Sequence, residues 1–171
     1  MSDVTAAIID RLRTLEGRLA ALERREWPYT AIGARVYNGG AFTHNSSGNW
    51  LSITFDSERF DTDGIHSTSS NAERLTCVTP GTYLITGTAL WTASGDGTAR
   101  GLRIMVGSTR IASEMRALPS TSVAPGITIS AIYQLTAGQY VTLDAYQNTG
   151  GSLDIVAYGN YSPEFSMVRI A

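Results

Sequence analysis

Four acidic side chains and a histidine lie close together in residues 56–66 and are the first candidates for site chemistry: Asp56, Glu58, Asp61, Asp63 and His66. Two carboxylates at a suitable separation can serve as acid and base in glycoside hydrolysis, and Asp61 and Asp63 could begin a calcium loop. The run lacks the later ligand and the terminal glutamate of an EF-hand, whereas carboxylates in an Asp-Gly turn bond their own backbone. We therefore interpret Asp61 and Asp63 as turn residues, with calcium as the alternative.

The remaining reactive residue types are not arranged for catalysis. His44 and His66 have no cysteine or carboxylate cluster at zinc spacing. No serine lies in a nucleophile elbow, and no phosphate-binding loop is present. The single cysteine, Cys77, is expected to be a small buried residue in a strand. The sequence predicts no enzymatic activity, no catalytic residue and no cofactor.

Length and charge limit the classes of partner. The chain has 171 residues and a net charge of −2, and all 13 of its basic residues are arginine. This length suits one domain with a short appendage, and this charge gives no bulk attraction to nucleic acid. No apolar run reaches the length of a membrane span, and the charged, amphipathic N-terminus does not resemble a secretory signal. We expect neither nucleic acid nor a membrane as partner.

The N-terminal segment repeats apolar residues at the spacing of a coiled coil. The repeat predicts a and d positions at Ile8, Leu12, Leu15, Leu19 and Leu22. Ser2 or Asp3 can cap the start of the helix, and Pro28 should end it near Trp27. The alternative is an amphipathic helix that packs on its own domain, but the apolar stripe is as narrow as a coiled-coil seam.

The charges beside this seam favour parallel pairing of identical chains. Arg11 and Arg18 occupy g positions, and Glu16 and Glu23 occupy e positions. In a parallel bundle, Arg11 faces Glu16 and Arg18 faces Glu23 of the neighbouring chain, whereas an antiparallel arrangement sets like charges together. The pattern predicts a self-associating stalk in residues 1–28, followed by a linker in residues 29–33.

From residue 34 onward the pattern is that of β-strands, with no second helix. Segments rich in β-branched and aromatic residues, separated by Gly, Asn, Ser, Pro and Asp, predict strands at 34–37, 50–55, 74–78, 82–91, 100–106, 109–115, 127–135, 140–147, 153–158 and 164–170. Ten strands at this spacing indicate a two-sheet sandwich.

Aromatic residues in these strands have two interpretations. They can pack in the core and between copies of the chain, or they can form a surface on which sugars stack. The first interpretation makes Tyr83, Trp91, Tyr140 and Tyr146 candidates for an interface between heads. The loops at 39–49 and 117–126 are long and polar or proline-flanked, and are the candidate ligand contacts.

Several motifs resemble the complement C1q family in the family's order. The segment from Leu75 to Tyr83 is similar to its signature, an apolar residue followed at a fixed distance by Gly-x-Tyr, with Leu75 in place of the usual Phe. The segment from Leu135 to Leu143 resembles its Leu-x-x-Gly-Asp-x-Val-x-Leu strand, with Gln139 in place of Asp. The ending at 165–170 is similar to its closing strand. The resemblance covers residues 34–171.

This resemblance implies a ten-stranded jelly-roll head that forms trimers, as in tumour-necrosis-factor-like ligands, with the parallel stalk joining three heads. The sequences at 55–64 and 161–167 resemble those of bacterial and bacteriophage members of the family. We therefore expect a homotrimer on a virion surface, either decorating a capsid or forming a head fibre. It would contact other virion proteins and could adsorb to a host-surface glycan. The alternatives are a receptor-binding tail-fibre head and a bacterial adhesion module.

Overall fold

The computed structural model describes residues 3–23, 31–118 and 123–171, which fall into two separate units, 1–30 and 31–171. The first contains helix α1 (Asp3–Glu23), which confirms the predicted N-terminal helix. The predicted end near Trp27 lies outside the described residues. Within the described residues, no helix is long and apolar enough to cross a membrane.

The second unit, here called the head, begins slightly before its predicted start. Gly33 is the first residue of β1, and the amide of Arg169 donates to the carbonyl of Ile32 at 2.8 Å. Residues 31–33 were predicted as linker. They belong to the head because β-sheet hydrogen bonds already hold them.

In the described residues the head contains twelve strands: β1 (Gly33–Tyr37), β2 (Phe42–His44), β3 (Trp50–Ser52), β4 (Ser57–Asp61), β5 (Arg74–Thr76), β6 (Gly81–Leu90), β7 (Ala99–Val106), β8 (Thr109–Ala117), β9 (Gly126–Leu135), β10 (Tyr140–Gln147), β11 (Leu153–Ile155) and β12 (Glu164–Arg169). All ten predicted segments contain a strand. Two strands, β2 and β4, were not predicted.

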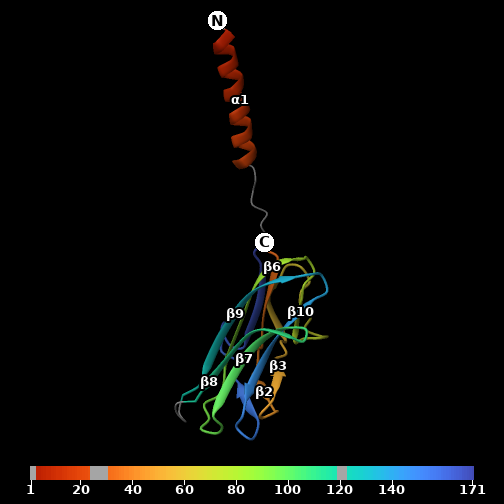
Figure 1. Ribbon diagram of the computed structural model, residues 1–171, viewed down its shortest axis with the longest axis vertical. Helices are drawn as coiled ribbons and strands as arrows, with labels where there is room; N and C mark the ends of the chain where they lie inside the picture. Colours follow the sequence, from red (N-terminus) through yellow and green to blue (C-terminus); the bar gives the residue numbers. More distant parts are fainter. Residues whose placement is uncertain (1–2, 24–30, 119–122) are drawn as a thin grey trace. The chain divides into compact units, whose positions relative to one another are not determined.

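Two antiparallel sheets form the sandwich (Figure 1). The β6 sheet has the order β4-β1-β12-β6-β9. The β10 sheet has the order β3-β10-β7-β8, and β5 also pairs with β10. A short ladder joins β11 to β2. Because the neighbours in each sheet come from distant parts of the chain, side chains far apart in sequence share one sheet face.

The core lies between the two sheets and follows the period-two pattern of the strands. Val141, Leu143 and Ala145 of β10 are fully buried, and so are Tyr83 and Ile85 of β6. Every second residue of a strand points to the same face, so this alternation directs one set of side chains into the core.

The two strands missed in the sequence are short or highly charged. β4 has the sequence Ser-Glu-Arg-Phe-Asp and pairs only through one edge, with β1. Charged residues on an edge strand discourage pairing with foreign strands, but they also weaken the strand signal. β2 is three residues long and carries His44, which is buried and lies 3.0 Å from the carbonyl of Ala145.

The head has two distinct ends. The chain enters it at Ala31 and ends at Ala171 on the same side, here called the proximal end; the amide of Thr82 donates to the carbonyl of Ala171 at 2.8 Å. The loop at 156–163, which joins β11 to β12, lies at the opposite or distal end, because β12 begins beside Tyr37 and Thr88 and then runs back.

Because the two sheets pack closely at Gly87, a larger side chain at this position should destabilise the head. A Cβ at this position would lie 2.5 Å from Cδ1 of Leu143, which is fully buried. We expect Gly87→Ala to lower the free energy of unfolding by about 1–3 kcal/mol, because the sheets must move to admit the methyl group. The measurement is urea unfolding at one fixed protein concentration.

The control for this substitution is Gly151→Ala. Nothing lies within 4 Å of a Cβ at Gly151, so this variant should unfold at nearly the wild-type urea concentration. Equal unfolding midpoints for the two variants would show that the sheets are not closely packed at Gly87.

Candidate functional site

The predicted acidic site is a turn. The carboxylate of Asp61 accepts hydrogen bonds from the backbone amides of Asp63, Ile65 and His66 at 2.9–3.1 Å. The carboxylate of Asp63 accepts from the amide of Thr79 at 3.1 Å. Asp61 therefore bonds the backbone of its own turn, as the turn interpretation expects, whereas Asp63 bonds the backbone of a segment sixteen residues away.

His66 is part of the same support. Its Nδ1 lies 2.9 Å from Oε1 of Glu58, and its Nε2 lies 3.2 Å from the carbonyl of Ala72. Across residues 31–118 and 123–171, no three His, Cys, Asp or Glu side chains are grouped as metal ligands would be. The side chains of this acidic segment therefore form hydrogen bonds that hold the chain in place around β4.

The predicted stalk interface lies on the exposed surface of α1. The side chains of Ile8, Leu12 and Leu15 are 54%, 52% and 57% exposed in the single chain. Arg11, Glu16 and Arg18 are also exposed. The side chains of Leu19, Leu22 and Glu23 lie outside the described residues. Pairing between helices stays a prediction.

Two of the four residues predicted at an interface between heads lie elsewhere. Tyr83 and Trp91 are fully buried within one chain, so neither has surface to offer a second copy. The hydroxyl of Tyr83 donates to the carbonyl of Thr79, and burial raises the pKa of Tyr83. These two residues are core, because their positions in β6 and just after it face the opposite sheet.

Tyr140 and Tyr146 lie half-buried on the outer face of the β10 sheet. The ring of Tyr146 contacts Trp50 at a centroid distance of 5.4 Å, and the guanidinium of Arg74 lies 4.2 Å from the ring centre of Tyr140. Their role between copies stays a prediction.

The outer face of the β6 sheet carries three cross-strand rows, set by the register of β12, β6 and β9. The row nearest the proximal end is apolar: Val168, Leu84 and Ile132. The middle row carries hydroxyls on Ser166, Thr86 and Ser130. The third row is Glu164, Thr88 and Thr128. Ile132 is 65% exposed, so the apolar row leaves a continuous hydrophobic strip in water.

A charged cluster occupies the distal end of this face. Glu164 is almost buried, and its two carboxylate oxygens accept from different arginines. Oε2 pairs with Nε of Arg35, and Oε1 lies 3.1 Å from Nη2 and 3.2 Å from Nε of Arg59. The guanidinium of Arg59 also lies 3.7 Å from the ring centre of Tyr37, which adds a cation–π contact.

The same arginines fasten the loop at 156–163 to the sheet. Nη2 of Arg35 donates to the carbonyl of Asn160 at 2.7 Å, and Nη2 of Arg59 donates to the carbonyl of Gly159 at 2.5 Å. At the other side of the loop, the hydroxyl of Ser162 accepts from the amide of Leu90 and donates to the carbonyl of Val156, both at 2.9 Å. These bonds fix the loop beside the sheet.

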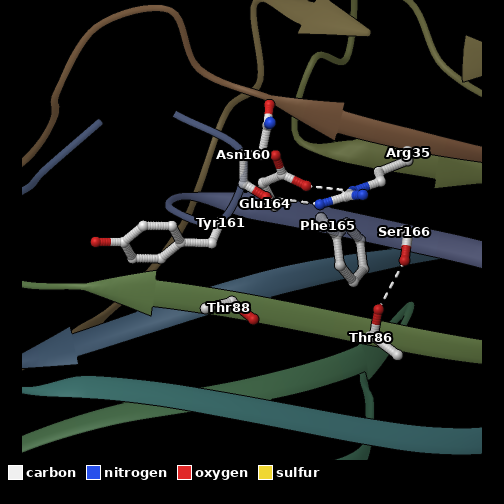
Figure 2. A pocket seen from close by; sticks show the side chains of 8 residues that line it. All are labelled: Arg35, Thr86, Thr88, Asn160, Tyr161, Glu164, Phe165 and Ser166. Atoms are coloured by element: carbon white, nitrogen blue, oxygen red, sulfur yellow. Dashed lines mark hydrogen bonds and ion pairs between the residues drawn. The ribbon is translucent and has the colours of Figure 1, made fainter. Parts of the chain in front are cut away.

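A hollow of about 260 Å³ lies between this loop and the sheet (Figure 2). Its sides are formed by the side chains of Arg35, Thr86, Thr88, Asn160, Tyr161 and Ser166, with Glu164 and Phe165 completing the lining. Figure 2 shows Tyr161 at one side of the hollow and Arg35 at the other. The lining combines hydroxyls, an amide, a guanidinium and an aromatic ring, which suits recognition of a polar ligand.

Tyr161 is held in place by a second tyrosine. The rings of Tyr158 and Tyr161 stack with a centroid distance of 5.9 Å and an interplanar angle of 2°, and both are more than half exposed. The sequence predicted a sugar-stacking surface as one possible role of the aromatic residues in general, but not this stacked pair. It did not identify Arg35, Arg59 or Glu164, which come together only through the register of β1, β4 and β12.

The central ion cluster should contribute to stability. We expect Glu164→Gln to lower the free energy of unfolding by about 1–3 kcal/mol, because both guanidinium groups lose their charged partner at a nearly buried position. The measurement is urea unfolding. Glu114→Gln is the control, since the pair between Glu114 and Arg116 is exposed and such pairs contribute little. A Glu164→Gln variant that unfolds like the control would contradict this role.

Comparisons with known proteins identify the fold of the head. No family model matches the chain, and no curated protein matches its sequence. Solved structures that align with 82% of this chain include the following three. The globular domain of zebrafish complement 1qA is 98% covered, with 18% identity and a TM-score of 0.54. Murine APRIL at pH 8.0 is fully covered, with 7% identity and a TM-score of 0.59. Eiger TNF from S. frugiperda is 93% covered, with 14% identity and a TM-score of 0.54.

Because these identities are low, the comparisons establish the fold alone. The head has the C1q/TNF-like jelly-roll fold that the sequence motifs predict, preceded by one helix. The structure adds β2 and β4 to the ten strands expected.

Proposed function

We propose that the protein is a non-enzymatic homotrimer displayed on a bacteriophage virion, as a capsid decoration or head fibre that can adsorb to host glycans. The observation that supports a trimer is the apolar surface that a single chain leaves exposed. On α1 this surface is the seam of Ile8, Leu12 and Leu15, each more than half exposed.

The energetics of this seam favour association. Complete burial of a leucine side chain contributes roughly 1.5–3 kcal/mol, so three copies of a seam provide a substantial driving force. The flanking Arg11 and Glu16 have the charge order required by a parallel arrangement. Three heptads are at the short end of what a coiled coil needs, and the apolar row on the head offers a second surface for association.

The head supports the same arrangement. Val168, Leu84 and Ile132 form an apolar strip across three adjacent strands, and strips of this kind commonly mark contacts with another protein. The C1q/TNF-like fold is typical of trimeric proteins. We therefore place the contacts between heads on the β6 sheet, in place of the buried Tyr83 and Trp91.

Display on a virion rests on the resemblance of residues 55–64 and 161–167 to bacteriophage members of this fold. Cryo-electron tomography of particles that carry the protein tests this location. Density on the capsid lattice would support decoration or a head fibre, and absence of the protein from purified particles would refute display.

The second candidate function is a receptor-binding head on a tail fibre. The exposed stack of Tyr158 and Tyr161 at the distal end favours it, because a binding tip should lie away from the attachment point. Density at a tail hub, with none on the capsid, would select this function over the first.

The stalk is tested by Leu15→Asp. A carboxylate at this d position would enter a desolvated seam, so we expect a fall in the association constant of at least tenfold at micromolar concentration. Sedimentation equilibrium gives the measurement. Thr14→Asp introduces the same charge at the neighbouring c position and should leave the mass unchanged. A Leu15→Asp protein with the wild-type mass would contradict a stalk built on this seam.

A further inference from the structure

We propose that the hollow beside Tyr161 binds an acidic sugar unit, such as a uronic or sialic acid residue of a host-surface glycan. This inference rests on the proposed function, since it requires the head to be displayed towards a host, and it names the ligand class of that head. The charge, the hydroxyl groups and the exposed aromatic ring of the hollow all suit this ligand.

The charge of the site is not balanced. Arg35 and Arg59 carry two positive charges, because guanidinium groups stay protonated in proteins, and Glu164 supplies one negative charge. Both oxygens of Glu164 already accept from these arginines. Among the described residues, no acceptor is bonded to Nη1 of either arginine. The site therefore favours a ligand that brings a carboxylate.

The hydroxyls of Thr86, Thr88 and Ser166 line the hollow beside this charge, and each belongs to a hydrogen-bonded pair. Thr86 Oγ1 lies 2.7 Å from Ser166 Oγ, and Thr88 Oγ1 lies 3.1 Å from Thr128 Oγ1. Each hydroxyl has one hydrogen and two lone pairs, and the contact within a pair uses one hydrogen. Every pair thus retains a donor and several acceptor positions. This is the complement of a sugar ring, which carries hydroxyls of the same kind.

The ring of Tyr161 supplies an aromatic surface. It is 54% exposed although it stacks on Tyr158. The negative face of an aromatic ring attracts weakly positive hydrogens, and the C–H groups of a sugar ring have this character. Figure 2 shows that the ring and the guanidinium of Arg35 lie on different sides of the hollow, so one ligand can contact both.

The size of the hollow suits a single ring. Its volume of about 260 Å³ is just below the range of roughly 300–1,000 Å³ that drug-sized ligands require. One terminal or internal acidic sugar would fit, and the rest of the glycan would continue outside.

A second copy of this chain is the competing occupant. The apolar row at Leu84 lies four residues along β6 from Thr88, roughly 13 Å at the rise of a strand. A neighbouring head can cover that row without filling the hollow. If it filled the hollow as well, it would bury an excess positive charge, which is unfavourable without a negative partner. We therefore assign the apolar row to the neighbour and the hollow to the ligand.

Isothermal titration calorimetry on the full-length protein tests the proposal with two matched pairs of probes. Trigalacturonate is compared with its methyl ester, and sialyllactose with the methyl ester of its sialic acid, so that the members of each pair differ only in whether the carboxyl group is charged. We expect at least one acid to bind ten times or more tightly than its neutral counterpart, and its affinity to fall as sodium chloride is raised. If neither acid binds better than its counterpart, the proposal is wrong.

Substitutions locate the site. We expect Arg35→Gln to weaken binding of the acid about tenfold or more, because a charged hydrogen bond is lost. Arg110→Gln removes the same charge from an exposed position on β8 and should have no effect. Equal weakening by the two variants would show diffuse attraction and would overturn the proposal.

Tyr161 provides a test that leaves the ion cluster intact. Tyr161→Ala should weaken binding several-fold, and Tyr161→Phe, which keeps the ring, should bind within about twofold of wild type. Unchanged binding by Tyr161→Ala would place the ligand elsewhere. Sedimentation of the same samples distinguishes a failure of this proposal from a failure of the proposed function. A wild-type trimer that binds no acid refutes ligand binding in the hollow, whereas a wild-type monomer refutes the proposed homotrimer. A Tyr161→Ala protein that loses trimers would identify the hollow as a contact between copies.

Discussion

Apolar side chains that one chain leaves in water are the constraint on which this account depends. Ile8, Leu12 and Leu15 are each about half exposed on α1, and Ile132 is still more exposed on the head. Single exposed apolar residues are common on protein surfaces, but here they form a seam on the helix and a strip across three strands. The proposed association of copies would remove both surfaces from water.

The register of the β6 sheet connects this constraint to the candidate site. The same alternation of β6 that directs Tyr83 into the core directs Leu84, Thr86 and Thr88 outward, from the proximal to the distal end. Moving along the strand, the outer face changes from apolar to hydroxyl-bearing and then to charged. The proposed association and the proposed recognition therefore use opposite ends of one sheet face, and Glu164 pairs with the two arginines that hold the distal loop.

The sequence predicted the helix and ten of the twelve strands described, but it did not predict the site. The helix and ten strand segments follow from spacing and from β-branched and aromatic content, and the jelly-roll fold follows from the order of the motifs. β4 was not predicted because its charged residues have low strand propensity. The pairing of Arg35 and Arg59 with Glu164 joins residues more than 100 positions apart, and only the strand register brings them together. Tyr83 and Trp91 were misplaced because aromatic character does not reveal which face a residue occupies.

The central claim is that three identical chains associate through the surfaces that one chain leaves exposed. Native mass spectrometry of the full-length protein at micromolar concentration tests it most directly. The account predicts a dominant species with three times the chain mass of 18.3 kDa. A dominant species with the mass of one chain or of two chains would contradict it.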